Sequence, residues 1–210
     1  RVIRPMQIPS IMNRDLARWL GYLVAEGSVD NKHVRFTNHD RDVVSDYLRL
    51  CNRLFGLAPK QYNHDYHLNS YIIGEWVSQF RIGDNSYSKR VPPQILCGTS
   101  EEQAEFLKAY FEGDGCFTVR KTYSKISAAS VSAILLEQIQ IMLLNFGVVA
   151  RVYSRQHSTY KNVTFYEMNI VGCFVDVFMR EIGFITKTKP YRLPQKPHRD
   201  ILPFQVQRLL

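Results

Sequence analysis

The stretch Trp19-Leu20-Gly21-Tyr22-Leu23-Val24-Ala25-Glu26-Gly27 decides the fold of this chain, because a similar stretch returns 88 residues later. The second copy reads Leu107-Lys108-Ala109-Tyr110-Phe111-Glu112-Gly113-Asp114-Gly115. Further landmarks recur in the same order: Phe55-Gly56 with Phe146-Gly147, Ile82-Gly83 with Ile182-Gly183, and Lys89 with Lys189. Landmarks that recur in register predict a duplicated structural unit.

The first unit is predicted to fold as helix, two strands, helix, two strands, helix. Apolar residues recur at helical spacing over 15–25, where Asn13 or Asp15 can cap the helix. Residues 33–37 alternate polar and apolar as a half-buried strand does. A second helix over 41–55 ends at Gly56, a hairpin lies within 57–73, and a short third helix covers 73–82.

The second unit is predicted to repeat this order, so the expected fold class is α+β. Its elements are a helix over 101–113 capped by Ser100, strands at 117–120 and around Ile126, a helix over 131–146, strands at 148–155 and 163–171, and a helix over 174–182. The expected domains are a first half-domain over 1–90 with its core at 10–90, a linker over 91–99, a second half-domain over 100–186, and a proline-containing tail over 187–210.

Composition narrows the class of partner. The formal charge is +8 and the isoelectric point is about 9.4, which favours a polyanion, nucleic acid before membrane. No apolar run approaches the roughly 18 residues that a membrane span needs. The chain begins without Met or a signal pattern and reads as a piece of something longer. Its 4 cysteines form no CxxC pair, which predicts reduced core thiols and a cytoplasmic protein.

Small residues predict that the two repeated helices pack against each other. Gly21 and Ala25 stand four apart in the first copy, as do Ala109 and Gly113 in the second. Small residues at this spacing let two helix backbones approach closely. If one small-residue ridge packs on the other, the acids that follow them, Glu26 and Asp114, meet at the same end of the pair.

These two acids are badly placed for stability, which points to function. A carboxylate at a helix C-terminus is disfavoured by about 0.3–1 kcal/mol, and two neighbouring carboxylates also repel each other. A hard divalent cation such as Mg²⁺ would resolve both conflicts. A solitary exposed acid before a helix-ending glycine is common, so it is the pair in register that carries the prediction.

Basic and polar residues on the predicted strands suggest a surface that contacts DNA. A β-ribbon fits the major groove, and arginine to guanine is the commonest base contact there. The polar face of an antiparallel sheet is also its ordinary solvent side, so each single residue has this second interpretation. The candidate DNA-binding residues are His33, Arg35, Thr37, Arg120, Arg151, Tyr153 and Arg155.

The repeated motif resembles that of the LAGLIDADG homing endonucleases, in particular the single-chain, double-motif kind found inside inteins. The eighth motif residue is an acid and the ninth a glycine, which correspond to Glu26-Gly27 and Asp114-Gly115; the first acid is glutamate where aspartate is commoner. The resemblance implies two pseudo-symmetric αββαββα halves with saddle-shaped antiparallel sheets and the motif helices at their interface. It also implies that Glu26, Asp114, Gly27 and Gly115 hold Mg²⁺, for which other divalent cations can substitute. Lys89 and Lys189, or Lys187 in place of the latter, would be the basic catalytic residues.

The same resemblance implies an activity and its partners. A monomer would cut both strands of a long, asymmetric duplex by Mg²⁺-dependent phosphodiester hydrolysis, leave 3′ overhangs, and associate with the nucleoid while bound. The splicing domain of a parent intein would be a further partner. The alternative is the same scaffold used only to bind nucleic acid, as a transcription regulator or RNA maturase; both acids are present, which favours the nuclease. A small-molecule enzyme is disfavoured because the sequence contains no GxGxxG, GxxxxGK[ST] or GxSxG motif.

Overall fold

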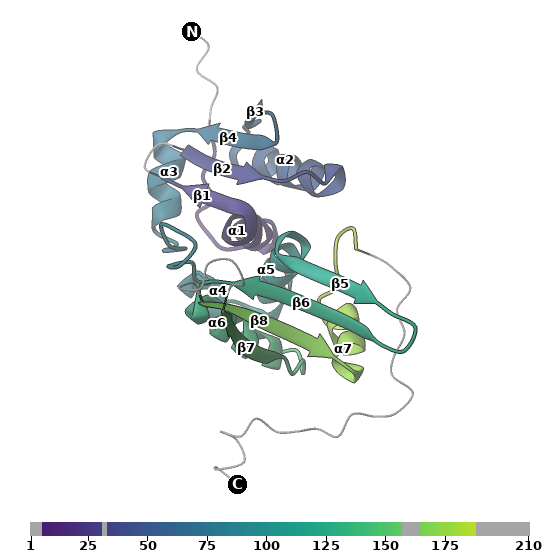
Figure 1. The fold of residues 1–210 in the computed structure, drawn as a ribbon. Coiled ribbons are helices and arrows are strands. Elements are labelled where there is room, and N and C mark those ends of the chain that lie inside the picture. The colour runs from purple at the N-terminus through teal and green to yellow at the C-terminus, as the bar shows by residue number, and fades with distance from the viewer. Residues whose placement is uncertain (1–5, 31–32, 157–163, 188–210) are drawn as a thin grey trace.

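The computed structural model describes residues 6–30, 33–156 and 164–187, which form two repeated αββαββα halves (Figure 1). The first half contains α1 (Arg14–Glu26), β1 (Gly27–Val29), β2 (His33–Thr37), α2 (Arg41–Phe55), β3 (Lys60–Tyr62), β4 (Asp65–Asn69) and α3 (Tyr71–Ser78). A short helix, α4 (Pro93–Leu96), precedes the second half. That half contains α5 (Ser100–Gly113), β5 (Gly115–Val119), β6 (Ser124–Ser130), α6 (Ala133–Leu144), β7 (Arg151–Gln156), β8 (Thr164–Val171) and α7 (Cys173–Glu181).

Each half carries a four-stranded antiparallel sheet, with strand orders β1-β2-β4-β3 and β5-β6-β8-β7. Helices α1 and α5 lie side by side between the two sheets, and their contact is the most extensive between any two elements (Figure 1). The predicted α+β class, with two repeated halves and the motif helices at the interface, is therefore confirmed.

Alternation along the strands decides which side chains enter the core. In β2, Val34 and Phe36 are fully buried while His33 and Arg35 are exposed. Phe36 stacks on Tyr47 of α2, with 4.1 Å between the ring centroids. The helices thus cover one face of the sheet and leave the other, with its polar side chains, open to solvent.

Several local predictions needed correction. Thr99, not Ser100, caps α5, because its side chain accepts from the Glu102 amide while the Glu102 carboxylate accepts from the Thr99 amide. Two strands were expected after the first helix, but only the second was located in the sequence; the first is β1. Helix α4 was not predicted, and α3 ends at Ser78 rather than at residue 82.

The prediction that all four cysteines are core thiols was wrong for three of them. Cys51 is buried, but Cys97, Cys116 and Cys173 are exposed. Apolar sequence neighbours misled here because Cys116 lies on β5, where successive side chains point to opposite faces. None of the helices in the described ranges combines the length and apolar character needed to cross a membrane.

Candidate active site between the motif helices

The small residues of the motif lie where the two helix backbones are closest. A Cβ on Gly21 would stand 2.4 Å from the Phe106 carbonyl oxygen and 2.9 Å from the Ala109 Cβ. A Cβ on Gly113 would stand 2.7 Å from the Ala25 Cβ. The structure therefore brings all four predicted interface residues together, and the contacts run in parallel register along the pair.

Both motif helices end at the acid–glycine junction. Glu26 is the last residue of α1, and Asp114 is the C-cap of α5. Gly27 is extended (φ −101°), so it is not required by a left-handed backbone. Glycine is needed at residue 27 because a Cβ there would lie 2.6 Å from the Leu23 Cα, too close for a side chain to fit. The same holds for Gly115, where a Cβ would lie 2.2 Å from the Phe111 carbonyl oxygen.

The two acids lie in one electrostatic neighbourhood. Burial raises the pKa of Asp114 to about 7, and the charge of Glu26 acts in the same direction. The ammonium groups of Lys89 and Lys187 oppose this rise. Glu26 also reaches across the interface, since its Cγ lies 3.1 Å from the point where Gly113 would carry a Cβ. Asp114 is thus a partly desolvated carboxylate beside a second carboxylate, which is an environment that a bound cation would relieve.

One lysine from each half reaches the helix ends. Lys89 Nζ donates to the Ala25 carbonyl oxygen at 2.8 Å; burial lowers the pKa of Lys89, and the charges of Asp114 and Glu26 oppose the shift. Lys187 Nζ donates to the carbonyl oxygens of Glu112 (2.6 Å), Gly115 (2.6 Å) and Phe111 (3.1 Å). Burial also lowers the pKa of Lys187, opposed most strongly by Glu112. Lys189 lies outside the described residues, so Lys187 is the second-half lysine that the structure places at the site.

Glu112 is a residue that the sequence prediction overlooked. Its side chain is buried and accepts hydrogen bonds from the Ile185 amide (2.6 Å), the Thr186 amide (3.2 Å) and the Thr186 hydroxyl. These bonds tie the segment that carries Lys187 to α5. The available signal was a charged residue at a core position of the motif helix, where the first copy has the apolar Val24.

The oxygen donors fit a hard divalent cation. Glu26 and Asp114 offer carboxylate oxygens beside the carbonyl groups at the helix ends, and Mg²⁺ prefers such ligands and retains several waters. Within the described ranges, no group of three or more His, Cys, Asp or Glu side chains could hold a metal by itself. A cation here would therefore depend on the two carboxylates together with carbonyl and water oxygens.

Comparison with known proteins agrees with this arrangement. The family model described as a LAGLIDADG-like domain matches residues 13–80 and 101–183, one match for each half. The chain belongs to the LAGLIDADG family. Its first 183 residues contain both family matches, and each match begins at or beside the start of a motif helix.

This LAGLIDADG chain matches short segments of much longer proteins. It is 31% identical over 203 residues to the DNA polymerase II large subunit of Thermococcus kodakarensis, covering 84% of this chain and 11% of that protein. It is 29% identical over 214 residues to the replication factor C small subunit of the same organism, covering 96% of this chain and 24% of that protein. The chain therefore spans a quarter or less of these relatives.

Solved LAGLIDADG structures share the fold. The homing endonuclease I-DmoI in complex with DNA and Ca superposes with a TM-score of 0.59 at 16% identity, covering 87% of this chain and 94% of that one. The N-terminal LAGLIDADG domain of DUF199/WhiA gives a TM-score of 0.58 at 14% identity, covering 96% of this chain and 90% of that one.

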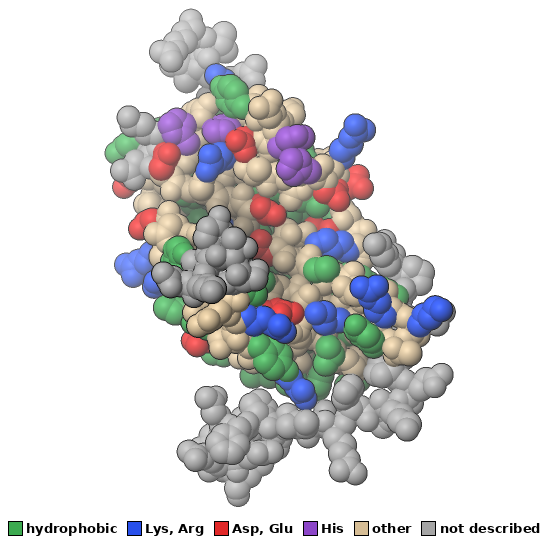
Figure 2. Space-filling model, viewed as in Figure 1, with side chains coloured by type: hydrophobic (Ala, Val, Ile, Leu, Met, Phe, Trp, Pro, Cys, Tyr) green, Lys and Arg blue, Asp and Glu red, His purple; other side chains and the backbone are tan. Residues whose placement is uncertain are grey.

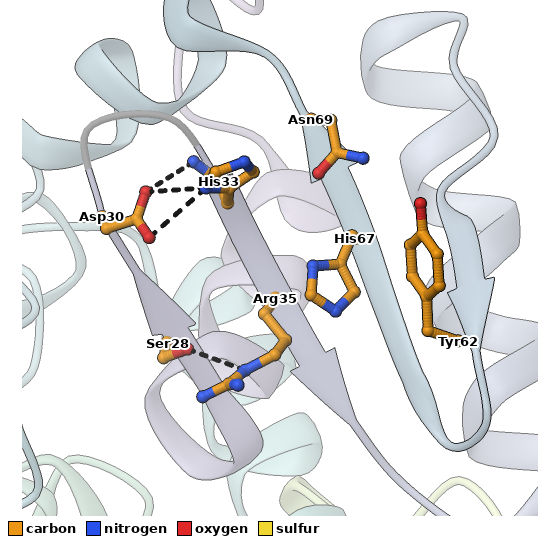
Figure 3. Close-up of a pocket in the computed structure, with 7 residues that line it drawn as sticks. All are labelled: Ser28, Asp30, His33, Arg35, Tyr62, His67 and Asn69. Carbon is orange, nitrogen blue, oxygen red and sulfur yellow. Dashed lines mark hydrogen bonds and ion pairs between the residues drawn. The ribbon is translucent and has the colours of Figure 1, made fainter.

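The open sheet face of the first LAGLIDADG half forms a groove of about 580 Å³ (Figure 3). The Arg35 Nε donates to the Ser28 hydroxyl at 3.1 Å, and His33 contacts Asp30 at 3.2 Å. The groove is lined by Ser28, Asp30, His33, Arg35, Tyr62, His67 and Asn69, of which His33 and Arg35 are among the candidate DNA-binding residues. Thr37 lies at the end of β2, where its hydroxyl donates to the Asp65 carboxylate at 2.5 Å.

The open sheet face of the second half is more basic. Arg151, Tyr153 and Arg155 are exposed on the edge strand β7, and Arg120 is exposed directly after β5. Arg155 pairs with Glu167 at 2.8 Å. Figure 2 shows the contrast between the halves: histidines gather over the first sheet, whereas Lys and Arg gather over the second.

Proposed function

We propose that this chain is a site-specific DNA endonuclease that cuts both strands of a duplex by Mg²⁺-dependent phosphodiester hydrolysis and leaves 3′ overhangs. The observation that carries the proposal is the meeting of Glu26 and Asp114, from different half-domains, with Lys89 and Lys187 beside them. Each half thus contributes one acid and one ammonium group to a single site between two polar sheet faces.

Each of these groups has a definable task. Glu26 and Asp114, with carbonyl oxygens at Gly27 and Gly115, would hold the cation; the Gly115 oxygen, which already accepts from Lys187, would use its second lone pair. When bound, Mg²⁺ would polarise a phosphoryl oxygen and lower the pKa of an attacking water. Lys89 and Lys187 place positive charge where the scissile phosphates gain negative charge, and their burial strengthens that interaction.

The two sheet faces supply the binding surface. We expect exposed residues of both sheet faces to contact phosphates and base edges of duplex DNA: Arg35 and His33 of the first half, and Arg120, Arg151, Tyr153 and Arg155 of the second. Because the two faces differ in composition, we expect the target to be long and asymmetric. Because one chain contains both acids, we expect a monomer to suffice.

The identity of the relatives supports an origin as an inserted element. A polymerase subunit, a replication factor and a replicative helicase have different functions, yet 72% to 96% of this chain aligns with only 11% to 24% of each. Such a distribution is expected of an intein endonuclease. A splicing domain of the parent protein would then be its partner within the longer chain.

Selection of cleaved duplexes from a randomised DNA library tests the proposal. We expect recovered ends with 3′ overhangs in Mg²⁺ and none in EDTA. Glu26→Gln and Asp114→Asn should abolish double-strand cleavage while retaining DNA binding, whereas the exposed Asp84→Asn should cut as the parent does. Binding without cleavage in any divalent cation would favour the alternative, a non-cutting transcription regulator or RNA maturase on this scaffold.

A further inference from the structure

The segment that carries Lys89 belongs to the first half-domain, but the second half-domain holds it. Ser132, the N-cap of α6, donates its hydroxyl proton to the Lys89 carbonyl oxygen at 2.7 Å. Two residues later, the Val91 amide donates to the Gln138 side-chain oxygen at 2.9 Å. Ser132 and Val91 are 2% and 0% exposed, so both anchors are shielded from competing water.

The Ser132 hydroxyl both accepts and donates a hydrogen bond in this position. Its oxygen accepts from the Leu135 amide at 3.3 Å, which caps α6, while its single proton goes to Lys89. At the other end of Lys89, the ammonium group contacts the Ala25 carbonyl oxygen and interacts with both motif acids. Helix α6 thereby fixes the position of the Lys89 backbone, and this position limits the points that the ammonium group can reach.

The corresponding position in the first half is chemically different. Helix α2 is capped by Asp40, whose carboxylate accepts from the amides of Asp42 (2.9 Å) and Val43 (3.3 Å). An ionised carboxylate has no proton to donate to a carbonyl oxygen. Asp40 and Lys187 instead line a cavity of about 420 Å³.

Residues near Lys187 are held by their own half. The Ile185 and Thr186 amides and the Thr186 hydroxyl all donate to Glu112 of α5. In the part of the chain that the structure describes, no hydrogen bond joins residues 183–187 to the first half. The two lysines are therefore anchored by different means, Lys89 across the interface and Lys187 within its half.

We propose that Ser132 and Gln138 are positioning residues for Lys89, and that they govern cleavage of only one DNA strand. The proposal rests on the nuclease function proposed above. Among the described residues, Ser132 and Gln138 make no hydrogen bond to either acid; they act by fixing the backbone of the lysine. Because a displacement of about 1 Å can slow a step by roughly a hundredfold, losing one anchor should selectively slow the strand that Lys89 serves.

Nicking of supercoiled plasmid carrying the selected target tests this directly. Lys89→Met first identifies the strand that depends on Lys89. With Ser132→Ala or Gln138→Ala, nicked circles should then accumulate in which that same strand is uncut. The cleavage rate of that strand should fall by about ten- to a hundredfold. Ser132→Thr, which keeps the hydroxyl, should restore parental cleavage.

Ser70→Ala is the matched control. Ser70 caps α3 by accepting from the Ile73 amide, but it makes no hydrogen bond to the Lys89 segment. Its loss should therefore slow both strands equally or neither. Two results would overturn the proposal. One is equal slowing of both strands in Ser132→Ala and Gln138→Ala; the other is that these variants leave uncut the strand that Lys89→Met still cleaves.

Amide hydrogen exchange gives a readout that does not need cleavage. Val91 should exchange faster in Ser132→Ala and Gln138→Ala than in the parent or in Ser70→Ala. Unchanged Val91 exchange in both anchor variants would overturn the anchoring. A parent that cuts no duplex would overturn the nuclease function instead, and the exchange experiment would still decide whether α6 anchors this segment.

Discussion

Glu26 and Gly113 belong to different half-domains, yet the Cγ of Glu26 lies 3.1 Å from the point where a Cβ on Gly113 would stand. The side chain that carries the first acid thus crosses the interface over a residue that has no side chain. The position of the acid pair and the close approach of the helices are consequently one structural feature, and changes in the helix contact should affect both.

Gly21→Ala should destabilise the protein. The new Cβ would stand 2.4 Å from the Phe106 carbonyl oxygen, a backbone atom that can move only with its helix. Overpacking of this kind costs about 1–3 kcal/mol, and the higher helix propensity of alanine, about 1 kcal/mol, offsets it only in part. Urea unfolding followed by circular dichroism measures the change, and an unaltered midpoint would contradict the close packing of α1 on α5.

Tyr22→Phe and Tyr110→Phe should differ although the two tyrosines occupy equivalent positions of the motif. The Tyr22 hydroxyl donates to the Asp46 carboxylate at 2.9 Å, so its loss should lower the free energy of unfolding by about 1–3 kcal/mol. The Tyr110 hydroxyl is buried without a hydrogen-bond partner among the described residues, so its loss should be neutral or stabilising. Thermal unfolding of both variants checks this, and equal losses would refute it.

The raised pKa of Asp114 should lower the free energy of unfolding as the pH rises. Burial and Glu26 raise its pKa from 3.8 to about 7 in the folded protein, so the folded state retains a proton that the unfolded chain has released. Between these two pH values, the fold is progressively destabilised as the carboxylate ionises, and above them the penalty stays constant. In metal-free buffer, Asp114→Asn should therefore become more stable than the parent across this range, while Asp84→Asn should not. Urea midpoints measured against pH test it; parallel curves for Asp114→Asn and the parent would exclude the effect.

DNA affinity should depend on salt through the arginines of the sheet faces. If Arg151 contacts a phosphate, Arg151→Gln should weaken binding and reduce the slope of log affinity against log salt by about 0.9. Arg53→Gln is the control, because Arg53 lies on α2 and pairs with Asp15 at 2.9 Å. Fluorescence anisotropy with a duplex in Ca²⁺ measures both slopes. A parental slope near zero would count against DNA as the partner.

One chain should bind one duplex. Both acids and both sheet faces are present in a single chain, so no second copy is needed to complete the site. Analytical ultracentrifugation should give a monomer alone and one protein per asymmetric duplex. Two proteins per duplex would contradict this arrangement.

The sequence by itself determined the duplication, the fold class and the position of the acids. The shared offset of 88 residues places Glu26 and Asp114 at equivalent helix ends, and Gly21 and Gly113 mark the faces that can approach. Strand β2 and helix α2 were predicted at their observed bounds because alternation, helical spacing and Gly56 are local signals. The bounds of these two elements depend on residues within a few positions of one another.

Only the tertiary structure decided which other residues complete the site. The spacing of Lys187 and Lys189 from Gly183 does not specify the course of an irregular segment, so it was the fold that brought Lys187 to the end of α5. His67 joins the groove of Arg35 because β4 pairs with β2, and Ser132 meets Lys89 because the two halves are packed together. Each of these contacts joins residues more than thirty positions apart. Long-range pairing of this kind follows from the packing of whole elements, which no local spacing in a single sequence encodes.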